Sequence, residues 1–401
     1  MKFFICVILI FMLAVFPVGA TQIASEYQNA EIFEPLPELI ETAAPIGQVL
    51  ELNAKSVILL EANSKQILYE SNSDERLKPA SITKIMSLLL VCEAIENGSL
   101  TLETQITASP YACSMGGSQI WLEPDEIMTV DELLKACFIA SANDATVALA
   151  EAVAGSEEAF VSLMNERAKQ LGLNGTNFVN TTGLDAEGHL TNAHDVAIMS
   201  AELISHELVK KYSTVWMDSL RQGESELVNT NKLVRFYEGC TGLKTGTTSG
   251  AGYCVSATAE RDGLSLVAVV MCADSSNNRF DDARKLLNYG FANYKYTTVD
   301  CSDIGEIKVP VLSGTAGSVL VVPDGNLNIL LKKSNMGAIT KSVSVPENVT
   351  APIAAGDTVG CVYVNVGQEQ VGVIELKAEH SVEKLTLKFI FKTLLRALFT
   401  L

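Results

Sequence analysis

Metal-ligand patterns and positive charge are both scarce in this sequence. Among 401 residues there are only four histidines, and the nine cysteines are scattered without a C-x-x-C pair. These spacings offer no recognisable zinc site, so neither a metal nor an organic cofactor is expected. The formal net charge of −18 argues against nucleic acid as a partner, because a polyanion binds to a basic surface.

Several catalytic signatures are also missing. The chain has no G-x-S-x-G elbow, no H-E-x-x-H and no G-x4-G-K loop. The adjacent pair His194-Asp195 could suggest a Ser-His-Asp triad, but the surrounding "TNAHDVAIM" is better explained as a helix start. An acidic residue there suits the positive end of the helix dipole. With 48% hydrophobic and 19% charged residues and no low-complexity tract, the chain is expected to form about two globular domains.

The N-terminus has the layout of a secretory signal peptide. Lys2 precedes the apolar run "FFICVILIFMLAVFPV", and small residues follow it, so cleavage is predicted near Ala20. A retained transmembrane anchor is the alternative, although the run is short for a span. Residues 1–20 are thus interpreted as the signal and residues 21–46, acidic and Pro-containing, as a flexible leader.

The C-terminus differs in charge from the rest of the chain. Residues 384–401, "KLTLKFIFKTLLRALFTL", contain four basic residues and no acidic one. Lys388, Lys392 and Arg396 are spaced by four and would form one stripe on a helix, with bulky apolar residues over much of the remaining surface. We therefore expect residues 383–401 to be an amphipathic helix that binds a membrane surface. A helix docked on the protein's own core is the alternative.

Between the termini the pattern predicts an α/β domain followed by an all-β domain. An α/β domain at 47–297 would hold one sheet with helices packed on it in a lobe of their own. The expected elements are a strand pair in 56–72, helices at 82–98, 129–155, 156–172 and 279–294, and strands at 240–248, 252–261 and 264–273. Short β-branched runs between Gly, Pro and Asn predict the all-β domain at 298–382. Cys240 and Cys254 could face each other across a hairpin in an exported chain, but buried free thiols are the default expectation.

Three short motifs lie in order within the first domain. They are S-x-x-K at Ser81 and Lys84, S-x-N at Ser141 and Asn143, and K-T-G at 244–246. Each is weak alone: the first could be a helix cap with a surface lysine, and the last a turn. Together they match the set used by penicillin-recognising serine enzymes.

The chemistry of the first motif explains its place at the edge of an apolar run. A serine hydroxyl becomes a nucleophile when a base takes its proton, and a lysine one helical turn away can reach it. An ordinary lysine is protonated at neutral pH. Burial and a second cation, here Lys244, would lower the pKa of Lys84 enough for it to act as that base.

From about residue 47 to 380 the sequence resembles the low-molecular-weight penicillin-binding proteins that act as serine-type D-Ala-D-Ala carboxypeptidases. The resemblance extends beyond the motifs to blocks such as "YESNSDERLKPASITKIMSLLL" and "GLKTGTTSGAGYCVSATAERDGLSLVAVVM". It implies a transpeptidase/β-lactamase-like fold, with an antiparallel sheet and a helical lobe. It also implies an exported enzyme at the outer face of the cytoplasmic membrane that trims peptidoglycan stem peptides ending in D-Ala-D-Ala and is inhibited covalently by β-lactams.

The resemblance also implies a role for each motif residue. Ser81 would form the acyl-enzyme, with Lys84 as the base and Ser141 as a proton relay toward the leaving amine near Lys244. Asn143 would bind the substrate's backbone. The N–H groups of Ser81 and Thr247 would bind the oxyanion. Thr245, Gly246 of the K-T-G strand and Arg279 would bind the terminal carboxylate. For Arg279 an ion pair with Asp281 or Asp282 is the alternative.

Two departures and two rivals remain. Ala142 replaces a glycine common in relatives, and Thr247 stands where some have histidine; the latter should affect deacylation and substrate preference. A class A β-lactamase shares the motifs but needs a glutamate for deacylation, and the stretch with Asp185 and Glu187 has no E-x-x-L-N pattern. A non-catalytic peptidoglycan-binding scaffold is the other rival.

Overall fold

A five-stranded sheet, in the order β2-β1-β9-β8-β7, is the framework of the first part of the chain in the computed structural model, which describes residues 50–399. Its strands are β1 (Ser56–Glu61), β2 (Ile67–Ser71), β7 (Cys240–Thr248), β8 (Gly252–Arg261) and β9 (Leu264–Ala273). Every residue of β1 is buried, and so is most of β9. Their near-continuous apolar runs are explained by cover on both faces of the sheet.

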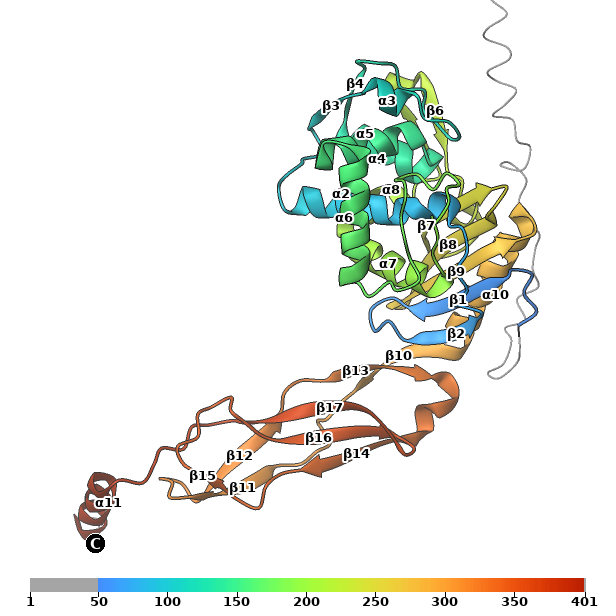
Figure 1. Ribbon diagram of the computed structural model, residues 1–401. Helices are drawn as coiled ribbons and strands as arrows, with labels where there is room; N and C mark the ends of the chain where they lie inside the picture. Colours follow the sequence, from blue (N-terminus) through green and yellow to red (C-terminus); the bar gives the residue numbers. More distant parts are fainter. Residues whose placement is uncertain (1–49, 400–401) are drawn as a thin grey trace, which may run out of the picture. The chain divides into compact units, whose positions relative to one another are not determined.

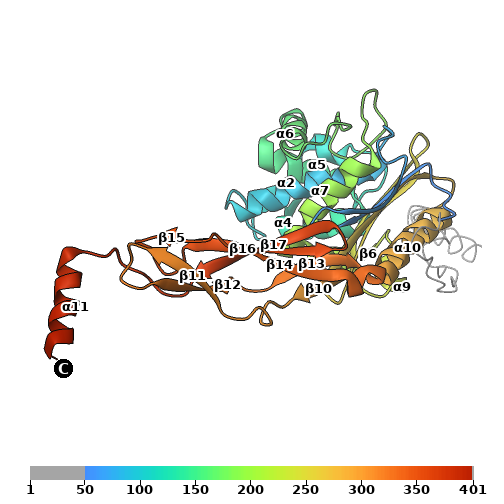
Figure 2. The same ribbon diagram turned by 90° about the horizontal axis from the view of Figure 1, so that it is seen from below.

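Helices cover the two faces unequally. Figures 1 and 2 show α10 on one side of the sheet and the remaining longer helices on the other. The helical elements are η2 (Ala80–Thr83), α2 (Lys84–Glu96), α3 (Pro110–Cys113), α4 (Val130–Lys135), η3 (Ala136–Ala140), α5 (Asn143–Ala154), α6 (Glu157–Gln170), α7 (Ala193–Ser205), α8 (Glu207–Ser213), η4 (Arg221–Gly223), α9 (Leu233–Phe236) and α10 (Ser276–Asn293). Two small antiparallel pairs join β3 (Gln105–Thr107) to β4 (Ile127–Thr129), and β5 (Met217–Leu220) to β6 (Ser225–Val228).

A second unit comprises residues 261–264 and 288–399 and is described by itself. Strands β10 (Tyr294–Val299) and β13 (Leu327–Lys332) form a pair. A six-stranded sheet runs β14 (Ile339–Ser344), β16 (Thr358–Val366), β17 (Glu369–Ala378), β12 (Ser318–Pro323), β11 (Ile307–Leu312) and β15 (Val349–Thr350). The short η5 (Lys333–Ala338) and the terminal α11 (Leu387–Phe399) complete it. Alternating valines and isoleucines supply its core.

Most expected elements are present. The strand pair, the three later strands and the helices after Ser81 and Ser156 are confirmed. Ser156 caps α6, since its hydroxyl accepts a hydrogen bond from the N–H of Ala159. Gly172 follows the end of that helix with φ of +74°, as a terminating glycine should. The predicted signal peptide and leader lie outside the described residues.

One prediction is wrong. The stretch 129–155 is not a single helix: α4 passes into a π-helical turn, and Ser141 then breaks the run with φ of +62°. Beyond the break the N–H of Asn143 donates to the carbonyl of Ser118 at 2.7 Å instead of to the preceding turn. The high helix propensity of this stretch is overridden by a tertiary hydrogen bond that starts α5 in a new direction.

Cys240 and Cys254 do not face each other across the hairpin, a pairing that the sequence had allowed. Both lie on the β7–β8 hairpin, but Cys240 is opposite Ala259 and Cys254 is opposite Gly246. The register therefore keeps the two sulfurs apart. All eight cysteines in the described part of the chain are free thiols.

Candidate active site

The S-x-x-K motif straddles the junction between η2 and α2. Ser81 lies in the 3-10 turn and Lys84 is the first residue of α2, so the side chains share one face. Lys84 has no exposed surface, whereas Ser81 is partly accessible. Lys84 Nζ lies 2.9 Å from Ser81 Oγ, 2.6 Å from Asn143 Oδ1 and 2.8 Å from the carbonyl oxygen of Thr182.

These contacts suit an amine that has lost a proton. A neutral amine has two N–H bonds and one lone pair, and two of the three neighbours of Lys84, Asn143 Oδ1 and the Thr182 carbonyl, can only accept hydrogen bonds. The lone pair is then left for the Ser81 hydroxyl. Burial lowers the pKa of Lys84 from 10.5 to about 7, against the opposing influence of Cys137 and Asp144.

Ser141 and Lys244 form a second buried pair. Lys244 Nζ donates to Ser141 Oγ at 2.8 Å and to the carbonyl of Thr245 at 3.2 Å. Burial lowers the pKa of Lys244 well below 10.5, and the nearby Lys84 lowers it further. Burial alone thus lowers the pKa of Lys84; the expected influence of Lys244 on it is not among the causes, and the charge effect acts on Lys244 instead.

The left-handed backbone at Ser141 accompanies the approach of its hydroxyl to Lys244, and Asn143, two residues later, starts α5. Asn143 contacts two other segments: its Oδ1 accepts from Lys84 and its Nδ2 donates to the carbonyl of Gly116 at 2.6 Å. A non-glycine residue is seldom held at φ near +60°, and such strain is concentrated at functional sites.

The K-T-G strand runs directly against the turn that carries Ser81. A Cβ at Gly246 would lie 2.9 Å from the backbone nitrogen of Ser81, so only glycine allows the close approach. Thr245 is buried and donates to Thr230 Oγ1 at 2.7 Å. Thr247, the next residue of β7 after Gly246, is exposed to solvent.

Arg279, in the first turns of α10, is buried behind the same strand. Its Nη1 donates to Thr247 Oγ1 at 2.9 Å and lies 3.3 Å from the carbonyl of Gly246. The alternative partners are occupied elsewhere: Asp281 pairs with Arg284, and Asp282 accepts from the N–H groups of Asn53 and Ala54. Arg279 thus supports the strand end and brings a positive charge to it.

The loop at 180–184 contacts the site although no sequence motif marks it. Its Thr182 carbonyl contacts Lys84, and Gly183 lies so close to the Ser81 turn that a Cβ would be 1.8 Å from the Ala80 carbonyl oxygen. Gly183 has φ of +89°, so glycine is required on both counts. Backbone carbonyls leave no residue-type pattern, so no motif could have identified this contact.

The rival catalytic residues are engaged in structural roles. Asp185 accepts from Thr248 Oγ1 at 2.9 Å and from the Gly250 N–H at 3.2 Å. Asp195 lies in the first turn of α7 and accepts from Gly175 and Thr176, as a helix start rather than a triad. Within residues 50–399, no three His, Cys, Asp or Glu side chains gather to hold a metal ion.

Comparison with known proteins agrees with this geometry. Residues 41–275 match the peptidase S11 model, described as D-alanyl-D-alanine carboxypeptidase, and residues 296–384 match the model of the penicillin-binding protein 5 C-terminal domain. The D-alanyl-D-alanine carboxypeptidase DacF of Bacillus subtilis is 40% identical over 335 residues, covering 82% of this chain and 86% of that protein.

Solved structures are similar over the same region. Penicillin-binding protein 5 from Haemophilus influenzae superposes with a TM-score of 0.72 at 28% identity, covering 84% of this chain and 99% of that one. Penicillin-binding protein D2 from Listeria monocytogenes, solved in an ampicillin-bound form, gives 0.56 at 32% identity, with 61% of this chain and 100% of that one covered.

Proposed function

The chain belongs to the peptidase S11 family of D-alanyl-D-alanine carboxypeptidases, and we propose that Ser81 is the nucleophile with which it removes the terminal D-alanine of peptidoglycan stem peptides. The single observation that carries this assignment is the 2.9 Å approach of Lys84 Nζ to Ser81 Oγ. Because burial holds the pKa of Lys84 near 7, a substantial fraction of the lysine is uncharged at neutral pH and able to accept the proton.

Acylation follows from this arrangement. Lys84 takes the hydroxyl proton as Ser81 Oγ attacks the carbonyl carbon of the penultimate D-alanine, which becomes tetrahedral. The N–H groups of Ser81 and Thr247 stabilise the oxygen that gains negative charge. The contact of Gly246 with the Ser81 turn supports this pairing, because it brings the two backbones together.

The leaving D-alanine needs a proton on its nitrogen. We assign its delivery to the Ser141 hydroxyl, which Lys244 orients from 2.8 Å. The C–N bond then breaks, the free D-alanine departs and the acyl group remains on Ser81. Ser141 acts as a relay: as it gives its own proton to the amine, it takes up the proton that Lys84 removed from Ser81, so Lys84 is neutral again for deacylation.

The substrate carboxylate is assigned to the end of β7. Lys244, Thr245 and Thr247 supply the donors, and Arg279 acts through Thr247, whose hydroxyl accepts from it and can direct its own proton to the carboxylate. A bound carboxylate would also favour the charged form of Lys244 over that of Lys84. Substrate binding would thereby help to keep the base neutral.

Asn143 is assigned to the opposite, acyl side of the scissile bond. One of its two amide hydrogens goes to Gly116, and the other is suited to a substrate backbone carbonyl. In deacylation Lys84 would activate a water that attacks the ester. The sequence has no E-x-x-L-N glutamate, Asp185 is bound by Thr248 and Gly250, and Glu187 lies on the surface. We therefore propose that a penicilloyl group is lost slowly from Ser81, and not turned over as in a β-lactamase.

The rest of the chain is proposed to set the location of the enzyme. None of the helices described here combines the length and apolar character needed to cross a membrane. The side chains of Leu387, Phe391, Leu394 and Leu398 are more than half exposed on α11, beside basic residues. We propose that an exported enzyme, with a catalytic domain at 47–297 and a β-domain at 298–382, is held peripherally on the outer face of the cytoplasmic membrane by residues 383–401.

The decisive experiment is mass spectrometry after incubation with benzylpenicillin. A persistent adduct on the peptide that contains Ser81 is expected, together with D-alanine release from a pentapeptide substrate. A Ser81→Ala variant should lose both, while Ser99→Ala, an exposed serine just after α2, should retain them. An adduct on another residue would refute the assignment, and rapid release of hydrolysed penicillin would favour the β-lactamase alternative.

A further inference from the structure

The loop between α3 and β4 displays a tryptophan in an unusual way. Trp121 is 57% exposed, and its φ of +57° lies in the left-handed region that bulky residues rarely adopt. An exposed indole with nothing to hold it would relax into extended backbone and cover its apolar surface. The surroundings of Trp121 must therefore fix it in place.

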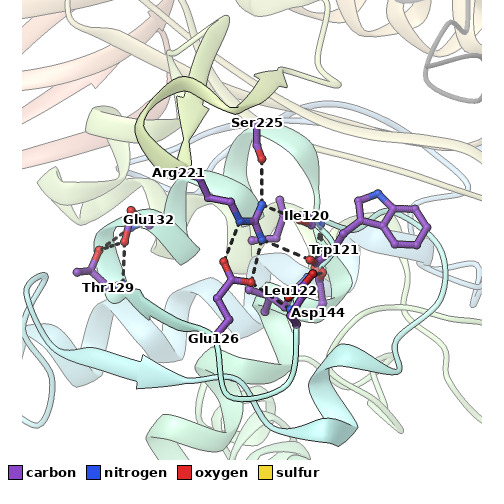
Figure 3. A network of polar contacts seen from close by, with 10 residues as sticks. Ile120, Trp121, Leu122, Glu126, Thr129, Glu132, Asp144, Arg221 and Ser225 are labelled. Atoms are coloured by element: carbon purple, nitrogen blue, oxygen red, sulfur yellow. Dashed lines mark hydrogen bonds and ion pairs between the residues drawn. The ribbon is translucent and has the colours of Figure 1, made fainter. Parts of the chain in front are cut away.

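Two buried or half-buried charged groups do so. The carboxylate of Asp144, which is fully buried, accepts from the N–H groups of Ile120 and Leu122 at 3.1 and 3.0 Å, on either side of Trp121. Arg221 donates to the carbonyls of Ile120 and Trp121 at 3.0 and 3.4 Å. Figure 3 shows this network, with the indole turned away from it.

Arg221 is itself locked by a bidentate ion pair. Its Nε and Nη2 lie 2.8 and 3.0 Å from the two carboxylate oxygens of Glu126, and it also donates to Ser225 Oγ. Such planar pairs fix direction as well as charge. The network therefore holds the backbone on both sides of one exposed aromatic ring.

The same loop contacts the acyl side of the site. The carbonyls of Gly116 and Ser118 accept from the side chain and the backbone N–H of Asn143, and Asp144 is the next residue of α5. A Cβ at Gly117 would lie 2.8 Å from Asn143 Nδ2, so the loop passes against that amide. Trp121 is three residues after Ser118, so the Cα atoms of these two residues are within about 11 Å of each other.

We propose that Trp121 is a specificity residue that binds the side chain of the stem-peptide residue preceding the D-Ala-D-Ala pair. This rests on the proposed function, in which Asn143 binds the backbone of that residue. A side chain with a long methylene stem at that position would offer an apolar surface to the indole face. The ring thus contributes to the choice of acyl donor and not to the chemistry.

The test compares two peptides that differ only at this side chain. They are Nα,Nε-diacetyl-Lys-D-Ala-D-Ala and Nα-acetyl-Gly-D-Ala-D-Ala. Trp121→Ala should lower kcat/KM for the lysine peptide about five- to tenfold, the worth of one aromatic contact, and leave the glycine peptide within about twofold. Trp121→Phe should retain part of the preference. Ile127→Ala, which removes another exposed apolar residue nearby, is the matched control.

Each result has a distinct meaning. Equal loss for both peptides would show a structural role for Trp121, and no loss for either would show that it does not touch the substrate; both overturn the proposal. The rate of acylation by 6-aminopenicillanic acid, which carries no group in the place of that side chain, should be unchanged in Trp121→Ala. Failure of wild-type Ser81 to acylate would instead refute the proposed function, separately from this inference.

Discussion

The carboxylate of Glu157 accepts hydrogen bonds from both the backbone N–H and the hydroxyl of Thr181, at 2.9 and 2.7 Å. Ser87 Oγ donates to the carbonyl of the same threonine at 2.7 Å. Thr181 is thus fixed on three sides, and the next residue, Thr182, presents its carbonyl to Lys84. A glutamate at the start of α6 therefore positions one hydrogen-bond partner of Lys84, the proposed base.

Removal of this carboxylate should affect both stability and acylation. Glu157→Ala leaves the N–H and hydroxyl of Thr181 buried without an acceptor, which costs about 2–4 kcal/mol of unfolding free energy. Penicillin acylation of Ser81 should slow about tenfold because the Thr182 carbonyl is no longer held. Urea unfolding and acylation kinetics measure the two effects. Glu158→Ala, on the exposed side of α6, should change neither, and acylation by Glu157→Ala within twofold of wild type would contradict the positioning role.

The pH dependence of acylation should report the titration of Lys84. Its pKa of about 7 means that the neutral base is lost as pH falls, so the acylation rate constant should drop about tenfold per pH unit below pH 7 and level off above it. Lys84→Arg should abolish acylation because guanidinium does not deprotonate. Lys78→Arg, outside the buried pair, should retain the profile. A flat profile between pH 5.5 and 8 would exclude Lys84 as the base.

His189 should make stability depend on pH. Its Nδ1 accepts from the Val179 N–H and its Nε2 lies 2.8 Å from Thr83 Oγ1, which fixes the neutral ring with the proton on Nε2. Burial lowers its pKa from 6.5 to about 4. Below pH 6.5 the imidazole of the unfolded chain takes up a proton, whereas that of the folded chain stays neutral until about pH 4. The free energy of unfolding should therefore fall by about 3 kcal/mol as the pH is lowered from 6.5 to 4.

Urea unfolding at pH 7, 5.5 and 4.5 tests this contribution. A His189→Gln variant should be less stable at pH 7 but should show a shallower loss toward pH 4.5 than the wild type. His194→Gln, in the more exposed first turn of α7, should keep the wild-type slope. Identical slopes for His189→Gln and wild type would rule out the buried neutral imidazole.

Gly246→Ala should separate folding from catalysis. The added methyl would meet the Ser81 backbone nitrogen at 2.9 Å and the Ala80 Cβ at 3.0 Å, so the strand must move away from the nucleophile. Loss of one aligned oxyanion donor costs about a hundredfold or more in rate. Acylation should fall accordingly while circular dichroism stays native. Gly305→Ala, where a Cβ meets open space, is the control; acylation within threefold for Gly246→Ala would remove the steric argument.

Much of the fold was predictable because its signals are local. The buried strands 240–248, 252–261 and 264–273 are β-branched runs bounded by Gly, and α6 has a serine cap and a terminating glycine. The break at Ser141 was not predictable, since no Gly or Pro stands there and the residues around it favour helix. It depends on a hydrogen bond to Ser118, whose position is set by another segment.

By itself, the sequence determined the order and chemistry of Ser81, Lys84, Ser141, Asn143 and the K-T-G strand, because residue type and helical spacing carry that information. Only the tertiary structure decided that Lys84 is fully buried, that a Thr182 carbonyl contacts it, and that the loop carrying Trp121 is bound to Asn143 and Asp144. The physical reason is distance along the chain: Lys84 and Thr182 are separated by 98 residues, and desolvation is a property of everything packed around a group.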